Sequence, residues 1–126
     1  MIDSLFHQPN YLAAKKLLEA TSAERVAISG NLANAETPGY QRLHVAPSFK
    51  LQLQEAIRTG DMSALDEIAV RIQEDSSVTT SRQDGNNVSI EREMFELMRN
   101  SMDHAMETQL LTGNLLRLRL AITGRP

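Results

Sequence analysis

The chain has 126 residues, no cysteine, only 4% aromatic residues and a formal net charge of -3. The missing cysteines exclude disulfide bonds and thiolate metal sites, and the slight acidity argues against a role in binding nucleic acid. No apolar run approaches the ~20 residues that a membrane span needs, and we find no Sec-type signal sequence. Sparse aromatic residues favour a thin core, and therefore an elongated helical subunit over a globular enzyme.

A first helix is predicted within residues 1–33. Apolar and small residues recur there in three- and four-residue steps, although Thr21 and Arg25 interrupt the stripe. Pro9 suits the first turn of a helix. The large apolar positions that we expect to pack against a partner helix are Leu18, Ile28 and Leu32.

The sequence that follows, GNLANAETPGY at residues 30–40, is the most specific local pattern in the chain. Pro38 and Gly39 suit the central positions of a type II turn, since proline fixes φ at the first and glycine supplies a positive φ at the second. Asn31 and Asn34 are expected to hydrogen-bond nearby backbone and end the helix. From Tyr40 onward the chain is expected to run extended. Taken alone, this motif also fits an ordinary loop.

Residues 34–85 form a predicted insert without long periodicity. Apolar residues within 49–57 and 64–72 indicate two short helices, separated by the break at Gly60 and Asp61. Residues 78–80 (VTT) have the composition of a strand. The insert is expected to contact adjacent subunits, and a mobile linker is the alternative.

A second long helix is predicted from about residue 88 to 123. Its evidence is an unbroken alternation of four- and three-residue steps, which we call the heptad seam. Its members are Ile90, Met94, Leu97, Ser101, His104, Thr108, Leu111, Leu115, Leu118 and Ile122. Because such a stripe needs a partner helix, we expect the two long helices to pair within one chain. His104 is expected in a polar layer that fixes helix register, and Glu91 and Glu93 fit the negative charge favoured near a helix N-terminus.

The predicted fold is therefore mainly α, with the N- and C-terminal helices paired as a coiled coil and a partly irregular insert. Residues 1–33 plus 86–126 form the expected coiled-coil core, and residues 34–85 form the insert. The heptad seam and its counterpart on the first helix are the expected assembly surface.

Two motifs resemble a known family. The run ISGNLANAETPGY at residues 28–40 is similar to the N-terminal signature A-N-N-I-A-N-x-x-T-P-G-Y of the rod, hook and hook-associated proteins of the bacterial flagellum. The departures are Ser29 and Gly30 for Ala-Asn, and Leu32 for Ile. The matching positions with an expected structural role are Asn31, Ala33, Asn34, Thr37, Pro38, Gly39 and Tyr40.

The second motif, DGNNVSI at residues 84–90, resembles the D-G-N-x-V-D sequence before the C-terminal helix of one type of proximal rod protein. Its matching positions are Asp84, Gly85, Asn86 and Val88. The short insert argues against hook and distal rod proteins, which are much longer. The absence of a D-V-N-x-V-E-E-M sequence argues against the other proximal type.

The resemblance implies a structural subunit of the proximal rod, the part of the drive shaft between the membrane ring and the distal rod, with no catalysis. It implies self-association in a helical rod, export by the flagellar type III apparatus without a cleaved signal, and a place in the periplasmic space. The implied neighbours are other rod proteins, the adaptor FliE and the ring protein FliF.

Two other classes fit parts of the sequence. A coiled-coil adaptor or secretion chaperone would share the heptad seam but would not need the Thr-Pro-Gly-Tyr turn. A four-helix-bundle enzyme would need inward carboxylates and histidines, and the seam offers only His104. The histidines are dispersed and no H-E-x-x-H sequence occurs, so no metal, cofactor or catalytic residue is predicted.

Overall fold

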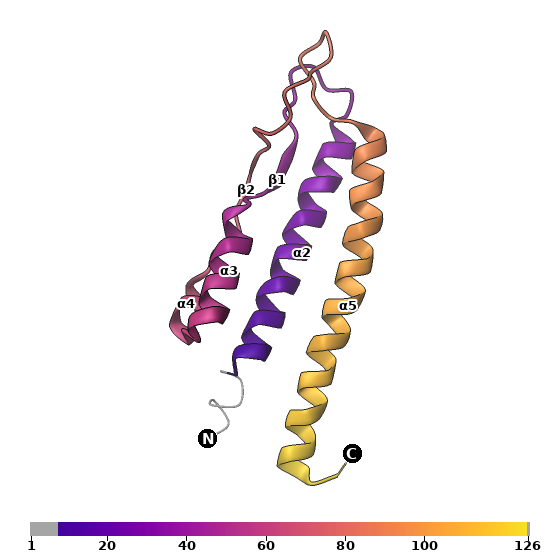
Figure 1. The fold of residues 1–126 in the computed structure, drawn as a ribbon. Helices are drawn as coiled ribbons and strands as arrows, with labels where there is room; N and C mark the ends of the chain where they lie inside the picture. Colours follow the sequence, from indigo (N-terminus) through magenta and orange to yellow (C-terminus); the bar gives the residue numbers. More distant parts are fainter. Residues whose placement is uncertain (1–7, 126) are drawn as a thin grey trace.

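The computed structural model describes residues 8–125. Along the chain the elements are α2 (Pro9–Ala33), β1 (Leu43–Val45), α3 (Ser48–Thr59), α4 (Met62–Glu67), β2 (Ile72–Glu74) and α5 (Ile90–Thr123). The long helices α2 and α5 lie side by side and antiparallel, and α3 and α4 pack on the other flank of α2 (Figure 1). The predicted mainly α fold and the pairing of the two long helices within one chain are confirmed. Residues 1–7 of the first predicted helix lie outside the described range.

Local signals set the ends of the long helices. Pro9 opens α2, and Asn34 is its C-cap, with its backbone N–H bonded to the carbonyl of Gly30. Ser89 caps the start of α5 by accepting the N–H of Arg92, and Glu91 lies in the first turn. The predicted limits of the second helix were thus close to those observed.

The insert contains two short helices, as predicted, with Gly60 as the C-cap of α3. The strand prediction was wrong. Residues 78–80 lie outside any strand, whereas Ile72–Glu74 pairs antiparallel with Leu43–Val45, so that Ile72 lies opposite Val45. The second helix also ends at Glu67, earlier than expected. Pairing with β1, which is distant in sequence, decides the strand position more strongly than local composition does.

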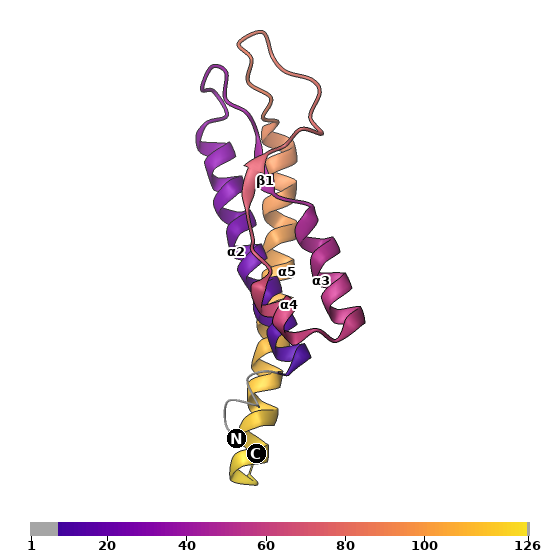
Figure 2. The same ribbon diagram turned by 90° about the vertical axis from the view of Figure 1, so that its left-hand side faces the viewer.

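A small apolar core joins the insert to the first half of α2. It is made of buried residues of α2, α3 and α4 with the residue after α4, namely Leu12, Phe49, Leu53, Ala56, Leu65 and Ile68. In the perpendicular view α3 stands apart from α5 (Figure 2). The insert is therefore anchored on α2, and within residues 8–125 many large apolar side chains of α5 stay exposed.

Candidate functional site

The two motifs meet at the end of the molecule where α2 ends and α5 begins. The N–H of Gly39 donates to the carbonyl of Asp84 at 2.8 Å. The Asn86 amide, which is fully buried, donates to the carbonyls of Asn34 and Thr37, both at 2.9 Å. Its Oδ1 accepts the N–H of Val88 at 2.8 Å. Asn86 thus ties the exit of the first helix to the entry of the second, and we call this set of contacts the motif clasp.

The turn within the clasp has the predicted type. Gly39 has φ of +74°, and the N–H of Tyr40 donates to the carbonyl of Thr37 at 3.2 Å, as in a type II turn. Gly85 also has a positive φ, and a Cβ there would lie 3.4 Å from the Cα of Gly39. Positive φ, rather than a lack of space for a Cβ, therefore favours glycine at both positions.

The two asparagines of the first motif have different roles. Asn34 ends α2 as predicted, since its side chain donates to the carbonyl of Gly30 at 2.9 Å. Asn31 does not end the helix, so that prediction was wrong. Its buried amide donates to the carbonyl of Leu43 and accepts the N–H of Leu43, both at 2.8 Å. Asn31 thus imitates a neighbouring strand and fixes β1 against α2.

Next to the clasp lies a buried charge network. Arg42 donates through Nε to Glu93 and through Nη1 to Asp75 at 2.6 Å. The second oxygen of Glu93 accepts the amide of Asn31 at 3.0 Å. All four side chains are almost completely buried, and Glu93 is 0% exposed. One cation and two carboxylates thus connect α5, the segment before β1 and the segment after β2.

The charges in this network shift each other's pKa values. Burial opposes the charge on Arg42, but the carboxylates of Glu93 and Asp75 more than compensate, so the pKa of Arg42 is raised. Burial also opposes the charge on Asp75, yet hydrogen bonds from Ser77 and Arg42 lower the pKa of Asp75. Both groups are therefore charged in the folded chain, which buried ions tolerate only when they are paired.

Sequence reasoning missed this network. Glu93 was interpreted only as a favourable charge near a helix N-terminus, and neither Arg42 nor Asp75 was given a role. One signal was present: Glu93, Asn100 and Glu107 are spaced by seven residues, the repeat expected of positions that face one partner helix.

All three polar residues hydrogen-bond to α2, Glu93 through Asn31. Asn100 donates to the carbonyl of Thr21 at 2.8 Å and accepts Nε of Arg25 at 2.9 Å. Glu107 accepts the hydroxyl of Thr21. Burial raises the pKa of Glu107, the nearby Asp103 carboxylate adds to this, and the bond from Thr21 opposes it. We call this row the polar ladder.

Only part of the heptad seam is covered, which corrects the expectation that the whole stripe packs against α2. Of its large members, Leu97 and Leu111 are half-buried and Leu118 is buried. Four others are 42–62% exposed, namely Ile90, Met94, Leu115 and Ile122. His104 is half-buried and makes no side-chain hydrogen bond within residues 8–125, so the polar layer lies at Asn100 instead. On α2, Ile28 is buried while Leu18 and Leu32 are half-buried.

A second apolar row on α5, the outer stripe, was not recognised in the sequence. It follows three- and four-residue steps through Gly113, and its large members are 46–72% exposed: Phe95, Met98, Met102, Met106, Leu110, Leu116 and Leu120. At ~1.5 Å per residue it extends for about 37 Å. α5 thus hydrogen-bonds to α2 through the polar ladder and leaves the outer stripe exposed.

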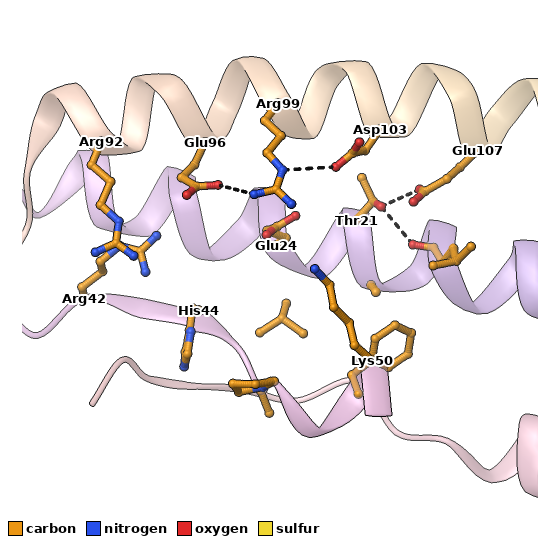
Figure 3. Close-up of a pocket in the computed structure, with 16 residues that line it drawn as sticks. Thr21, Glu24, Arg42, His44, Lys50, Arg92, Glu96, Arg99, Asp103 and Glu107 are labelled. Atoms are coloured by element: carbon orange, nitrogen blue, oxygen red, sulfur yellow. Dashed lines mark hydrogen bonds and ion pairs between the residues drawn. The ribbon is translucent and has the colours of Figure 1, made fainter. Parts of the chain in front are cut away.

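A cleft of about 300 Å³ opens between α5 and the β1–α3 segment, with α2 behind it (Figure 3). Acidic and basic side chains alternate along its α5 wall, where Arg99 lies 4.0 Å from both Glu96 and Asp103. Lys50 extends into it from the opposite wall (Figure 3). Its charges largely compensate each other, so the cleft has no strong preference for an anion or a cation.

Within the described part of the chain, no group of three or more histidine or acidic side chains is placed to hold a metal ion. None of the helices in residues 8–125 is long and apolar enough to cross a lipid bilayer.

Comparison with known proteins points to the same family that the two motifs resemble. No protein-family model matches the chain. The chain is 29% identical over 116 residues to the flagellar basal body rod protein FlgB of Aquifex aeolicus, covering 88% of this chain and 90% of that protein. It is 29% identical to FlgB of Bacillus subtilis over 115 residues, covering 85% and 88%. FlgB of Aeromonas hydrophila is 24% identical over 115 residues, covering 85% and 87%.

These matches extend well beyond the motifs and include the insert between the long helices. They confirm the resemblance that the two motifs indicated: along most of its length, the chain is similar to flagellar basal body rod proteins of the FlgB type.

Proposed function

We propose that the chain is a structural subunit of the proximal rod of the bacterial flagellum, where it polymerises into the shaft between the membrane ring and the distal rod. Its similarity to three FlgB proteins supports a structural role in the basal body rod. The FlgB type is favoured over the FlgC type by the D-G-N-N-V sequence and by these matches.

The observation that carries the proposal is the outer stripe of α5. Isolated exposed apolar residues are common, but a continuous row of this length on one helix marks an interaction surface. Because methionine is flexible and polarizable, Met98, Met102 and Met106 could each fit more than one neighbour. A subunit at the base of a shaft contacts its own copies and different proteins, and such a surface suits both.

The motif clasp supports the proposal in a second way. A shaft subunit must transmit torque without its two long helices sliding past each other. The clasp and the buried charge network join these helices at one end, and the polar ladder fixes their register along the contact. We propose that these contacts keep the outer stripe in a defined position for assembly.

The proposed neighbours are further copies of the chain, other rod proteins, the adaptor FliE and the ring protein FliF. The proposed place is the periplasmic part of the basal body, reached through the flagellar type III export apparatus.

The test is Met102→Asp, because Met102 is 72% exposed at the middle of the outer stripe. The helical content of the subunit should change little, since most of the Met102 side chain faces solvent. Self-association in sedimentation experiments and rod assembly in cells should both fail, because a carboxylate would be buried against apolar neighbours. Ser22→Asp places the same charge at an exposed position of α2 and should leave assembly intact. Normal assembly of the Met102→Asp variant would overturn the proposal.

A further inference from the structure

A groove of about 660 Å³ lies between α3 and α4, away from the clasp and from the outer stripe. Its apolar lining includes Ala56 and Ile68, which are buried, and Leu51, which is 68% exposed. The exposed Leu51 side chain extends the apolar lining of the groove and offers a contact for another apolar surface.

The edge of this groove is acidic. Asp61 and Glu67 line it, both are exposed, and neither forms an ion pair with a residue that the structure describes. A third carboxylate, Glu55, is neutralised by Arg58 at 2.6 Å. Asp61 accepts the N–H of Ala64 as the N-cap of α4, and neither its charge nor that of Glu67 is neutralised by a described cation. The groove therefore has two uncompensated negative charges beside an apolar lining, which favours an apolar and basic partner.

The end of α5 has the complementary chemistry. From Thr108 to Arg125 the sequence contains three arginines and no acidic side chain. Arg117 and Arg119 are exposed and form no ion pair within the described residues. Between and beside them, Leu116 and Leu120 are 58% and 46% exposed. In Figure 1 this end of α5 extends past the start of α2, so α2 leaves it uncovered.

We propose that the groove between α3 and α4 binds the end of α5, residues 115–122, of a second copy of the chain. The two surfaces are different patches of the same molecule, so the contact is head-to-tail. Repeated contacts of this kind build an open filament unless the rotation between copies closes a ring. The inference rests on the proposed self-association and identifies one of its interfaces.

Charge reversal tests the contact in the full chain. Glu67→Arg and Arg117→Glu should each weaken self-association by about tenfold or more, because each places like charges opposite one another. Asp66→Arg is the matched control, since Asp66 is exposed on the same helix but does not line the groove. It should associate like the unaltered chain.

Mixing the two reversed chains tests whether the groove and the end of α5 meet each other. In an equimolar mixture, the basic groove of the Glu67→Arg chain can bind the acidic α5 end of the Arg117→Glu chain. The unaltered groove of the second chain can likewise bind the unaltered α5 end of the first, so association should recover.

A second measurement uses disulfide formation, because the chain has no cysteine of its own. Ala64 lines the groove and Leu116 lies at the exposed end of α5. A mixture of the single-cysteine chains Ala64→Cys and Leu116→Cys should form a disulfide-linked heterodimer.

The outcomes distinguish this inference from the proposed function. If Met102→Asp abolishes association while Glu67→Arg, Arg117→Glu and the mixture all behave like the unaltered chain, the groove contact is wrong and the subunit role stands. If the two reversals weaken association but their mixture does not recover, the groove contact is also wrong. An unaltered chain that stays monomeric at every concentration would overturn both.

Discussion

Replacing Glu93 by glutamine is the sharpest test of the buried charge network. Both partners of Glu93 are donors, Nε of Arg42 and the amide of Asn31. A carboxylate accepts from both, whereas an amide has one accepting oxygen and one NH₂ group. In the Glu93→Gln variant, the new NH₂ group must therefore face one of these two donors. Arg42 also loses one of its two anionic partners.

The expected loss of stability follows from these two effects. Removing one partner of a buried ion pair costs about 3–5 kcal/mol when the remaining charge is unpaired. Here Asp75 still pairs with Arg42 at 2.6 Å, so we expect a value near the lower limit, about 3 kcal/mol. A chain of this length has a total stability of roughly 6–19 kcal/mol at ~0.05–0.15 kcal/mol per residue. The change is thus large enough to measure well.

Urea unfolding followed by far-UV circular dichroism gives the free energy directly. Glu91→Gln is the matched control, because Glu91 is exposed in the same helical turn and its carboxylate, among the described residues, accepts only from Ser89, at 3.1 Å. That variant should lose less than about 1 kcal/mol, the usual value of a surface charge near a helix end. Similar losses for the two variants would refute the idea that the network is a major source of stability.

Two further predictions concern the clasp and the polar ladder. Gly39→Val should destabilise the chain by about 2 kcal/mol, since valine tolerates a φ of +74° poorly, although a Cβ at this position would have no neighbour within 4 Å among the described residues. Gly39→Asn, which suits positive φ, should lose much less stability. Equal losses in urea unfolding would contradict the turn assignment. The raised pKa of Glu107 means that its protonated form favours the folded state. Unaltered protein should therefore lose stability relative to Glu107→Gln as the pH rises from the ordinary glutamate pKa through the raised one, and a difference independent of pH would exclude this coupling.

The parts of the fold that local chemistry determines could be predicted from the sequence. Periodicity predicted the two long helices, and the break at Gly60 and Asp61 separated the two short ones. The type II turn followed from Pro38 and Gly39 alone. Each of these predictions depends on residues within a few positions of each other, where backbone preferences are strong.

The candidate site depended on distant pairs, and the sequence could not supply them. Arg42, Asp75 and Glu93 are far apart in the chain, and they meet only because β1 pairs with β2 while Asn31 holds Leu43 against α2. Once that register is set, Asp75 follows β2 directly and its N–H donates to the carbonyl of Arg42 at 2.8 Å. A strand placed at residues 78–80 puts none of these groups in reach of one another.

The heptad seam shows a second limit of prediction from sequence. Both the seam and the outer stripe of α5 satisfy a rule of three- and four-residue steps, and such a rule does not say which row meets the partner helix within the chain. The structure places neither row fully on α2. The hydrogen bonds to α2 are made by the polar ladder, whose members Glu93, Asn100 and Glu107 were not counted because they are not apolar.

This arrangement has a physical consequence for a subunit that must associate with others. Hydrogen bonds add little net free energy but penalise wrong registers strongly, because a shifted helix leaves buried donors and acceptors without partners. The chain uses such groups between α2 and α5, at Asn100 and Glu107, where one register is required. Apolar contacts are less directional and provide most of the free energy of association. The apolar side chains of the outer stripe are exposed along α5, so the free energy of burying them is gained only when neighbouring subunits bind. The register within the subunit and the strength of assembly therefore depend on different sets of side chains.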